Sequence, residues 1–284
     1  MAARISISLN WKGFGQVWAS LAQVFHVRVF LRSSGGALPA ESSHTFCQVS
    51  ATKGSASSEL VHFVRVLKAR YGKLMILSDG EGSLQKVVSD AARQCGLEYS
   101  ATKVDTPQSN GVAEQRVRVV RECVQGVLEE IRKRRVFVNS QSKLFAWVVR
   151  HCGWLMNHVR RRVWNPLGFY TSVYEAHTGR VTTDVPLAFL ERMLYHRNDK
   201  DPRQPRWNHG WLLGYQGANC FVLQPGGQVR QCGEWRPTPE AEQGNEELKQ
   251  ALKEMGQPRV RTVGCRGCEL GPQARYRHNE ECRS

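Results

Sequence analysis

The fold is decided by two stretches, Leu77-Ser78-Asp79-Gly80-Glu81 and Thr106-Pro107-Gln108-Ser109-Asn110-Gly111-Val112-Ala113-Glu114. Asp79 follows the short apolar run 73–77, which its length predicts to be a buried strand. Glu114 lies in the first turn of a helix predicted to begin near Asn110. A carboxylate at a strand end and another at a helix start can converge on Mg²⁺ or a similar divalent ion. The helix dipole also favours an acid at Glu114 without any catalysis.

The helix that carries Glu114 has a continuous apolar stripe. Its members recur at steps of four and three residues, which predicts a long amphipathic helix: Ala113, Val117, Val120, Val124, Val127 and Ile131. Arg118 and Arg121 follow Glu114 by one and two turns and share its face, where they could hold phosphates. The run Arg132-Lys133-Arg134-Arg135 closes the helix.

The pattern around these stretches predicts an α/β fold followed by a β module. Helices are expected over 59–71 and 84–95, and strands over 44–53, 73–77 and 97–102, so strands and helices alternate. Four short strands are expected over 187–196, 207–215, 219–223 and 229–235, with turn residues between them. Residues 237–258 read as a linker that contains a helix over 246–255.

Composition favours a polyanionic partner. The 284 residues include 40 Lys and Arg against 25 Asp and Glu, a formal charge of +15. Binding of clustered positive charge to phosphates is favourable, because it releases counterions from the phosphates. Nine cysteines, six of them scattered singly, fit a reducing compartment. No uninterrupted apolar run reaches the roughly 18 residues of a transmembrane helix, so we expect no membrane partner.

The two stretches resemble the second and third catalytic segments of Copia-type retrotransposon integrases. The resemblance continues through Trp164-Asn165-Pro166, the segment 174–180 and Trp211-Leu212-Leu213-Gly214-Tyr215, and so covers about residues 50–237. It implies a ribonuclease H-like mixed sheet flanked by helices, followed by a small β-barrel module. It places the core at 44–180, the module at 186–237 and a linker with a basic tail at 238–284.

The resemblance also implies DNA integration by metal-dependent strand transfer. Asp79 and Glu114 would be catalytic carboxylates that hold Mg²⁺ or Mn²⁺. The residues expected to contact nucleic acid are Asn110, Arg118, Arg121, Arg132, Lys133, Arg134 and Arg135. Expected partners are the element's DNA ends and the target DNA, with self-association. A nuclear location or a cytoplasmic particle is expected. The alternative is an organelle transit peptide in the acid-free residues 1–40.

One part of the family pattern has no counterpart here. The family's first catalytic Asp lies on the first core strand, but this chain has no acid before Glu41, which sits in a loop-like context, and Glu59 opens a helix. Residues 1–43 resemble nothing in the family. We therefore expect impaired catalysis. A non-catalytic nucleic-acid-binding remnant of a transposable element is the alternative, and an unrelated ribonuclease H-like nuclease is a third hypothesis.

The C-terminal tail holds four ligands that zinc accepts, namely Cys265, Cys268, His278 and Cys282. Their paired spacing suits a tetrahedral Cys₃His site. A basic tail with free thiols explains the same residues, and short Cys/His patterns give many false matches. Histidines 62, 151, 158 and 177 show no catalytic pattern and are expected to be ordinary surface or core residues.

Overall fold

The structure is a computed structural model that forms two compact units, Met1–Cys123 with Cys152–Val185, and Val124–His151 with Pro186–Ser284. It describes residues 3–8, 22–31, 40–49, 58–71, 74–78, 82–101, 107–138, 142–160, 163–164, 170–180, 186–196, 205–217, 219–238 and 245–255. No helix in these ranges is both long enough and apolar enough to cross a membrane.

The first unit is built on a mixed five-stranded sheet. Its strands are β1 (Ala3–Ser8), β2 (Ala22–Leu31), β3 (Ala40–Val49), β4 (Leu74–Ser78) and β5 (Glu98–Ala101), in the order β3-β2-β1-β4-β5. Strand β2 runs antiparallel to both β1 and β3, whereas β4 is parallel to β1 and β5 is parallel to β4. This is the mixed sheet predicted for a ribonuclease H-like core.

The N-terminal segment belongs to this sheet. Residues 1–43 have no recognisable family motif, yet β1, β2 and the start of β3 supply three of the five strands. Glu41 lies within β3, opposite Phe30 of β2, and not in the loop that its surroundings suggested. Glu59 lies in α2 (Ser58–Tyr71), as predicted. The sheet therefore begins earlier along the chain than the motifs quoted for the resemblance.

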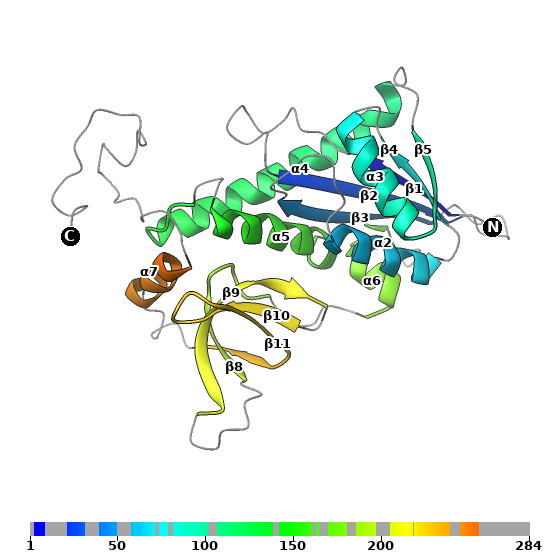
Figure 1. The fold of residues 1–284 in the computed structure, drawn as a ribbon. Coiled ribbons are helices and arrows are strands. Elements are labelled where there is room, and N and C mark those ends of the chain that lie inside the picture. The colour runs from blue at the N-terminus through cyan, green and yellow to red at the C-terminus, as the bar shows by residue number, and fades with distance from the viewer. Residues whose placement is uncertain are drawn as a thin grey trace, which may run out of the picture. The chain divides into compact units, whose positions relative to one another are not determined.

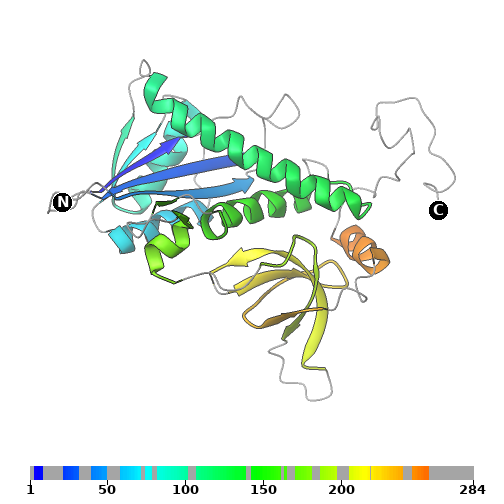
Figure 2. The ribbon, with the colours of Figure 1, turned by 180° about the vertical axis from the view of Figure 1, so that it is seen from behind.

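Helices cover both faces of the sheet (Figures 1 and 2). Helices α2 and α3 (Gly82–Gln94) lie on one face and α4 (Pro107–Lys133) lies on the other. The side chains that α2 and α3 bury recur at helical spacing: Leu60, Val61, Val64, Leu67, Val87, Val88, Ala91 and Ala92. The Lys68 ammonium group donates to the Cys95 carbonyl at 2.7 Å and so satisfies a carbonyl just beyond the end of α3.

The predicted apolar stripe of α4 is confirmed where its side chains are described. Val120, Val124 and Ile131 are buried, and Val127 is partly buried. Helix α5 (Lys143–His158) follows, then the short strands β6 (Val163–Trp164) and β7 (Tyr170–Thr171), and α6 (Val173–Thr178). Gly153 lets α5 approach β3, because a Cβ atom there would lie 3.0 Å from Cys47 Cβ.

The second unit contains the predicted β module. Its strands are β8 (Arg192–His196), β9 (Trp207–Gln216), β10 (Asn219–Leu223), β11 (Val229–Cys232) and β12 (Trp235–Pro237). They form an antiparallel sheet in the order β11-β10-β9-β8-β12, so β11 and β12 are its edge strands. The predicted ranges 207–215 and 219–223 match β9 and β10, and the range 229–235 is divided between β11 and β12. Of the range 187–196, only the last five residues form a strand, β8.

The second unit also buries the first half of α5 and the C-terminal helix. The Arg150 guanidinium stacks on the Phe221 ring at 4.4 Å and bonds to Gln216 at 3.0 Å. Helix α7 (Asn245–Glu254), predicted at 246–255, buries Leu248, Ala251, Leu252 and the following Met255. Glu247 of α7 forms an ion pair of 3.2 Å with Arg192 of β8. The predicted linker region therefore adds a helix that packs in this unit.

Candidate functional site

The parallel pair β1 and β4 organises the candidate site in the first unit. In their register Ile7 lies opposite Ser78, so both strands finish at the same edge of the sheet. Asp79 follows Ser78 directly but lies outside the described residues, so the structure supplies no position for its carboxylate. The carboxyl-end edge of parallel strands is where open α/β sheets place their ligands.

Strand β1 contributes no carboxylate to this edge. Its six residues, Ala3–Ser8, read ARISIS. Glu41 is on β3, two strands away from β1, which corresponds to roughly 9–10 Å at the usual strand spacing. Glu59 is on a helix. Hence none of the acids that precede Asp79 lies on the strand that is hydrogen-bonded to β4.

Glu114 lies in α4, but deeper than expected. The helix begins at Pro107, not near Asn110, because proline is well tolerated at the first helical position. Asn110 is therefore inside the helix, and Glu114 is about two turns from its start rather than in the first turn. The Glu114 side chain is outside the described part of the structure. The predicted dipole effect on this acid is correspondingly weaker, since it fades beyond the first turn.

Arg118 and Arg121 differ in exposure. The Arg118 side chain is 69% exposed, and its Nε lies 3.7 Å from a Glu122 carboxylate oxygen. Arg121 is partly buried. Exposed ion pairs of this length are weak, so a phosphate can compete for Arg118. Of the two arginines, Arg118 is the more accessible to an anion in solution.

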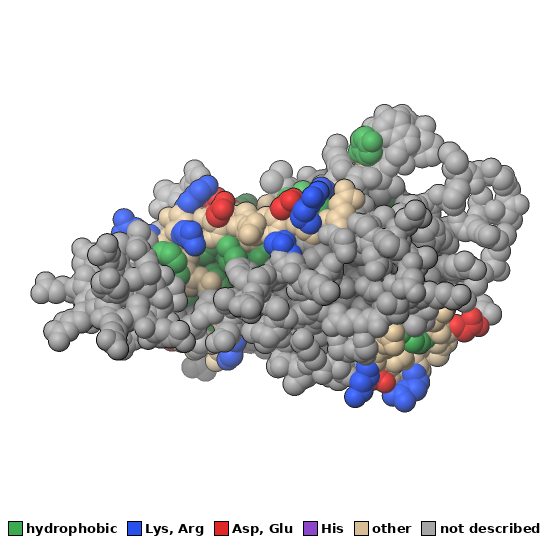
Figure 3. Space-filling model, turned by 90° about the horizontal axis from the view of Figure 1, so that it is seen from above, with side chains coloured by type: hydrophobic (Ala, Val, Ile, Leu, Met, Phe, Trp, Pro, Cys, Tyr) green, Lys and Arg blue, Asp and Glu red, His purple; other side chains and the backbone are tan. Residues whose placement is uncertain are grey.

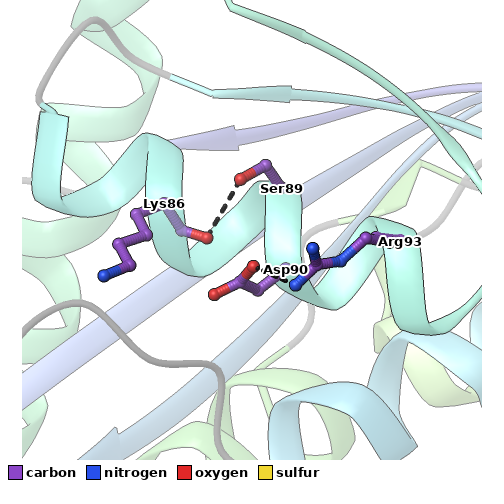
Figure 4. A network of polar contacts seen from close by, with 4 residues as sticks. All are labelled: Lys86, Ser89, Asp90 and Arg93. Carbon is purple, nitrogen blue, oxygen red and sulfur yellow. Dashed lines mark hydrogen bonds and ion pairs between the residues drawn. The ribbon is translucent and has the colours of Figure 1, made fainter.

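Helix α3 adds a cation that the sequence analysis did not single out. Lys86 is exposed, and its side chain extends away from the neighbouring ion pair of 2.8 Å between Arg93 and Asp90 (Figure 4). The Lys86 carbonyl accepts a hydrogen bond from the Ser89 hydroxyl at 3.0 Å. Helix α3 begins just after the Asp79 segment. The closeness of Lys86 to that segment in the sequence is the signal that could have identified it.

The basic run at the end of α4 does not act as one cluster. Arg134 donates to the Leu190 carbonyl at 2.9 Å and is partly buried, so it is a packing residue and not a free phosphate ligand. Lys133 is paired with Glu130 at 2.8 Å. That bond lowers the pKa of the Glu130 carboxyl and raises the pKa of Lys133. Arg132 and Arg135 are exposed.

Positive charge is interleaved with negative charge on the face shown in Figure 3. Described Lys and Arg side chains there stand among Asp and Glu side chains and do not form a single uninterrupted patch.

Several residues of the segment 174–180, which carries part of the family resemblance, have structural roles together with their neighbours. Ser172 and Glu175 form a reciprocal cap at the start of α6, with bonds of 3.0 and 2.9 Å. Gly179 ends that helix with a φ of 67°, which glycine adopts without strain. Tyr174 stacks on the His158 imidazole at 4.7 Å. These matches are explained by packing and capping and carry no information about chemistry.

The buried histidines are packing residues, as expected. His151 is 2% exposed, and burial lowers its pKa to about 4. His158 stacks between Trp154 and Tyr174, and burial lowers its pKa as well. His62 is exposed. His177 belongs to α6, and its side chain is not described.

No described group of three His, Cys, Asp or Glu residues is arranged to hold a metal ion. Asp79 and the four tail residues Cys265, Cys268, His278 and Cys282 lie outside the described ranges. Both the Mg²⁺ or Mn²⁺ prediction and the Zn²⁺ prediction therefore remain predictions. Strand β1, which pairs in parallel with β4, carries no Asp or Glu that could serve as a metal ligand.

Comparison with known proteins found no matching family model and no matching curated protein. Among solved structures, the chain is similar to a chain of the simian T-cell lymphotropic virus intasome in complex with PP2A regulatory subunit B56 gamma. That match has 10% identity and a TM-score of 0.35, over 84% of this chain and 78% of the other. The catalytic core domain of BIV integrase matches with 14% identity and a TM-score of 0.36, over 62% and 93%. These similarities concern the fold alone.

Proposed function

We propose that this chain is an integrase-like protein of a retrotransposon that binds DNA but performs strand transfer poorly or not at all. The observation that carries the second half of this proposal is the composition of β1. The strand paired in parallel with β4 contains no Asp or Glu, although the family resemblance puts the first catalytic Asp there. The DNA-integration half is supported by the Asp79 and Glu114 segments and by the strand order.

The missing carboxylate affects metal binding before it affects chemistry. In a two-ion site the first Asp bridges both ions, and Asp79 and Glu114 would each hold one. Without the bridge each ion has one protein carboxylate, and Mg²⁺ held so weakly keeps most of its water. We therefore assign no catalytic step to this chain. Mg²⁺ or Mn²⁺ would be its cofactor only in a form that is active.

DNA binding needs no intact triad. We propose that exposed cations distributed over both units contact phosphates: Lys86, Arg118, Arg132 and Arg135. The proposed partners are the element's DNA ends and the target DNA, with self-association of the chain on them. The proposed location is the nucleus or a cytoplasmic particle. The basic C-terminal tail would be a further element of this interface, and its proposed Zn²⁺ ligands are Cys265, Cys268, His278 and Cys282.

Salt-dependent binding tests this proposal. Affinity of the purified chain for a fluorescent duplex would be measured by anisotropy between about 50 and 200 mM salt, a range over which several phosphate contacts give a steep fall. Lys86→Ala, Arg118→Ala and Arg132→Ala should each lower the slope of log affinity against log salt by about one. Lys133→Ala should lower it less, because Glu130 already neutralises that ammonium group. A salt-independent interaction, or no binding, would contradict the proposal.

Zinc in the tail can be tested separately on the full chain. Metal analysis after dialysis against a weak chelator should find about one zinc per chain, reduced when Cys268 and Cys282 are replaced by Ser. A Cys95→Ser variant is the matched control, because Cys95 is a buried thiol of the first unit. Absence of zinc from the unmodified chain would end the tail proposal and leave the DNA-binding proposal unaffected.

A further inference from the structure

Two buried thiols face each other at the edge of the β module. Cys220 of β10 lies directly opposite Cys232 of β11 in the antiparallel register, and their sulfur atoms are 3.1 Å apart. The two residues are 0% and 5% exposed. Neither thiol belongs to the candidate site in the first unit, and neither is explained by the proposed function.

The backbone is already in position for a covalent bond between them. Directly paired residues of antiparallel strands have Cα atoms about 4.5–5.5 Å apart. A disulfide spans Cα separations of about 4.4–6.8 Å, with sulfur atoms about 2.05 Å apart. Bond formation therefore requires the two sulfur atoms to approach by about 1 Å, which side-chain rotation provides.

The position of β11 gives a small oxidant a route to the pair. β11 is an edge strand, so it is hydrogen-bonded within the sheet only to β10. Its neighbouring residues Val229 and Gln231 are exposed. Edge strands with exposed backbone open locally more readily than central strands. A molecule as small as a peroxide can therefore reach Cys232.

The two thiols also differ in acidity. The hydrogen bond with Cys220 lowers the pKa of Cys232, and the nearby Arg230 guanidinium lowers it further. The same hydrogen bond, together with burial, raises the pKa of Cys220. Because the thiolate is the reactive form of cysteine, Cys232 is the sulfur expected to react first.

We propose that Cys220 and Cys232 form a reversible disulfide when the protein meets a peroxide. The Cys232 thiolate attacks one peroxide oxygen, the O–O bond breaks, and the products are a sulfenic acid and hydroxide. The Cys220 sulfur then attacks the Cys232 sulfur, the S–O bond breaks, and the leaving hydroxide takes the Cys220 proton to form water. Two thiols lose two electrons, and the peroxide is reduced to water. Edge strand β11 is then covalently held to β10.

Peptide mapping of the full chain tests the proposal. The chain would be treated with hydrogen peroxide, blocked with N-ethylmaleimide and digested with trypsin, which cleaves after Arg230, between the two cysteines. The expected product is a joined pair of peptides containing Cys220 and Cys232, which dithiothreitol separates. The oxidised chain should also unfold at a higher temperature, by roughly 5 °C or more, because the cross-link restricts the unfolded chain.

Variants distinguish this pair from the other thiols. Cys220→Ser and Cys232→Ser should each abolish the joined peptides, whereas Cys95→Ser should leave them unchanged, because the Cys95 sulfur contacts the Val61 carbonyl oxygen at 3.6 Å in the other unit. Recovery of both cysteines as N-ethylmaleimide adducts, or of Cys232 only as a sulfinic or sulfonic acid, would overturn the proposal. So would formation of the pair at the same rate in guanidinium-unfolded protein.

Discussion

Ile7 of β1 lies opposite Ser78 of β4 in a parallel register. In the sequence, Ser8 follows Ile7 and Asp79 follows Ser78. Strand β1 contains alanine, arginine, isoleucine and serine and no acid. The proposed impairment of catalysis rests on this composition of the strand that pairs with β4.

Adding a carboxylate at Ser8 should restore part of the activity. We predict that Ser8→Asp raises Mn²⁺-dependent DNA joining at least about tenfold above the unmodified chain, equivalent to about 1.4 kcal/mol of barrier. Ser8→Asn is the matched control, since it has a similar shape without the charge. Equal joining by the two variants would show that this edge of β1 does not meet the other carboxylates.

Arg134 should matter for stability and not for DNA binding. Its hydrogen bond to the Leu190 carbonyl is made by a charged, partly buried group, and such bonds contribute about 1.5–3 kcal/mol. Arg134→Ala should lower the free energy of unfolding by about that amount in urea titrations. Arg135→Ala, which removes an exposed cation from the next position, should change it by less than about 0.5 kcal/mol. A larger loss of stability in Arg135→Ala than in Arg134→Ala would contradict the packing role of Arg134.

Two glycines should respond oppositely to the same substitution. A Cβ atom at Gly210 would overlap the Val222 side chain and crowd the Leu223 carbonyl, so Gly210→Ala should destabilise the second unit by about 1–3 kcal/mol. Gly126 lies inside α4 with open space around it, and Gly126→Ala should stabilise the chain by about 1 kcal/mol. Thermal unfolding of both variants measures the contrast. If Gly126→Ala destabilises the chain instead, another part of the protein packs against α4 at this position.

His151 should make stability depend on pH between about 4 and 6.5. Burial lowers its folded-state pKa to about 4, so in this window the unfolded chain binds more protons and stability falls as the pH falls. The loss between pH 6.5 and pH 5 should reach at most about 2 kcal/mol. Denaturant titrations of His151→Gln should show a flatter pH profile. If His151→Gln shows the same pH profile as the unmodified chain, the pH dependence of stability arises from other groups, such as His158, whose pKa is also lowered by burial.

Local patterns predicted the helices and the β module well. The α4 stripe from Val120 to Ile131 and the strands from β8 to β10 are set by periodicity and turn residues within short windows. Strands β1 and β2 were not predicted, because their place in the sheet depends on pairing with segments far along the chain. Glu41 illustrates the difficulty, since its flanking glycine and proline suggest a loop although it pairs within β3.

The candidate site was only partly predictable for the same reason. The Asp79 and Glu114 motif lies in two short segments and was recognised from the sequence alone. The absence of an acid before Glu41 is likewise evident from the sequence. That β1 is the strand beside β4 could not be predicted, because this pairing joins segments that are far apart in the sequence. The basic run 132–135 looked uniform in sequence, but the Leu190 carbonyl engages Arg134 and Glu130 engages Lys133.

The most direct test of the central claim is a joining assay with the unmodified chain. The chain would be incubated with a labelled duplex and plasmid DNA in Mg²⁺ or Mn²⁺, beside Glu114→Gln, under conditions where anisotropy confirms that both bind DNA. We predict binding by both proteins and joining by the unmodified chain no greater than by Glu114→Gln. Cleavage without joining would favour an unrelated nuclease. Robust joining that Glu114→Gln abolishes would contradict the claim that this chain lacks a working catalytic site.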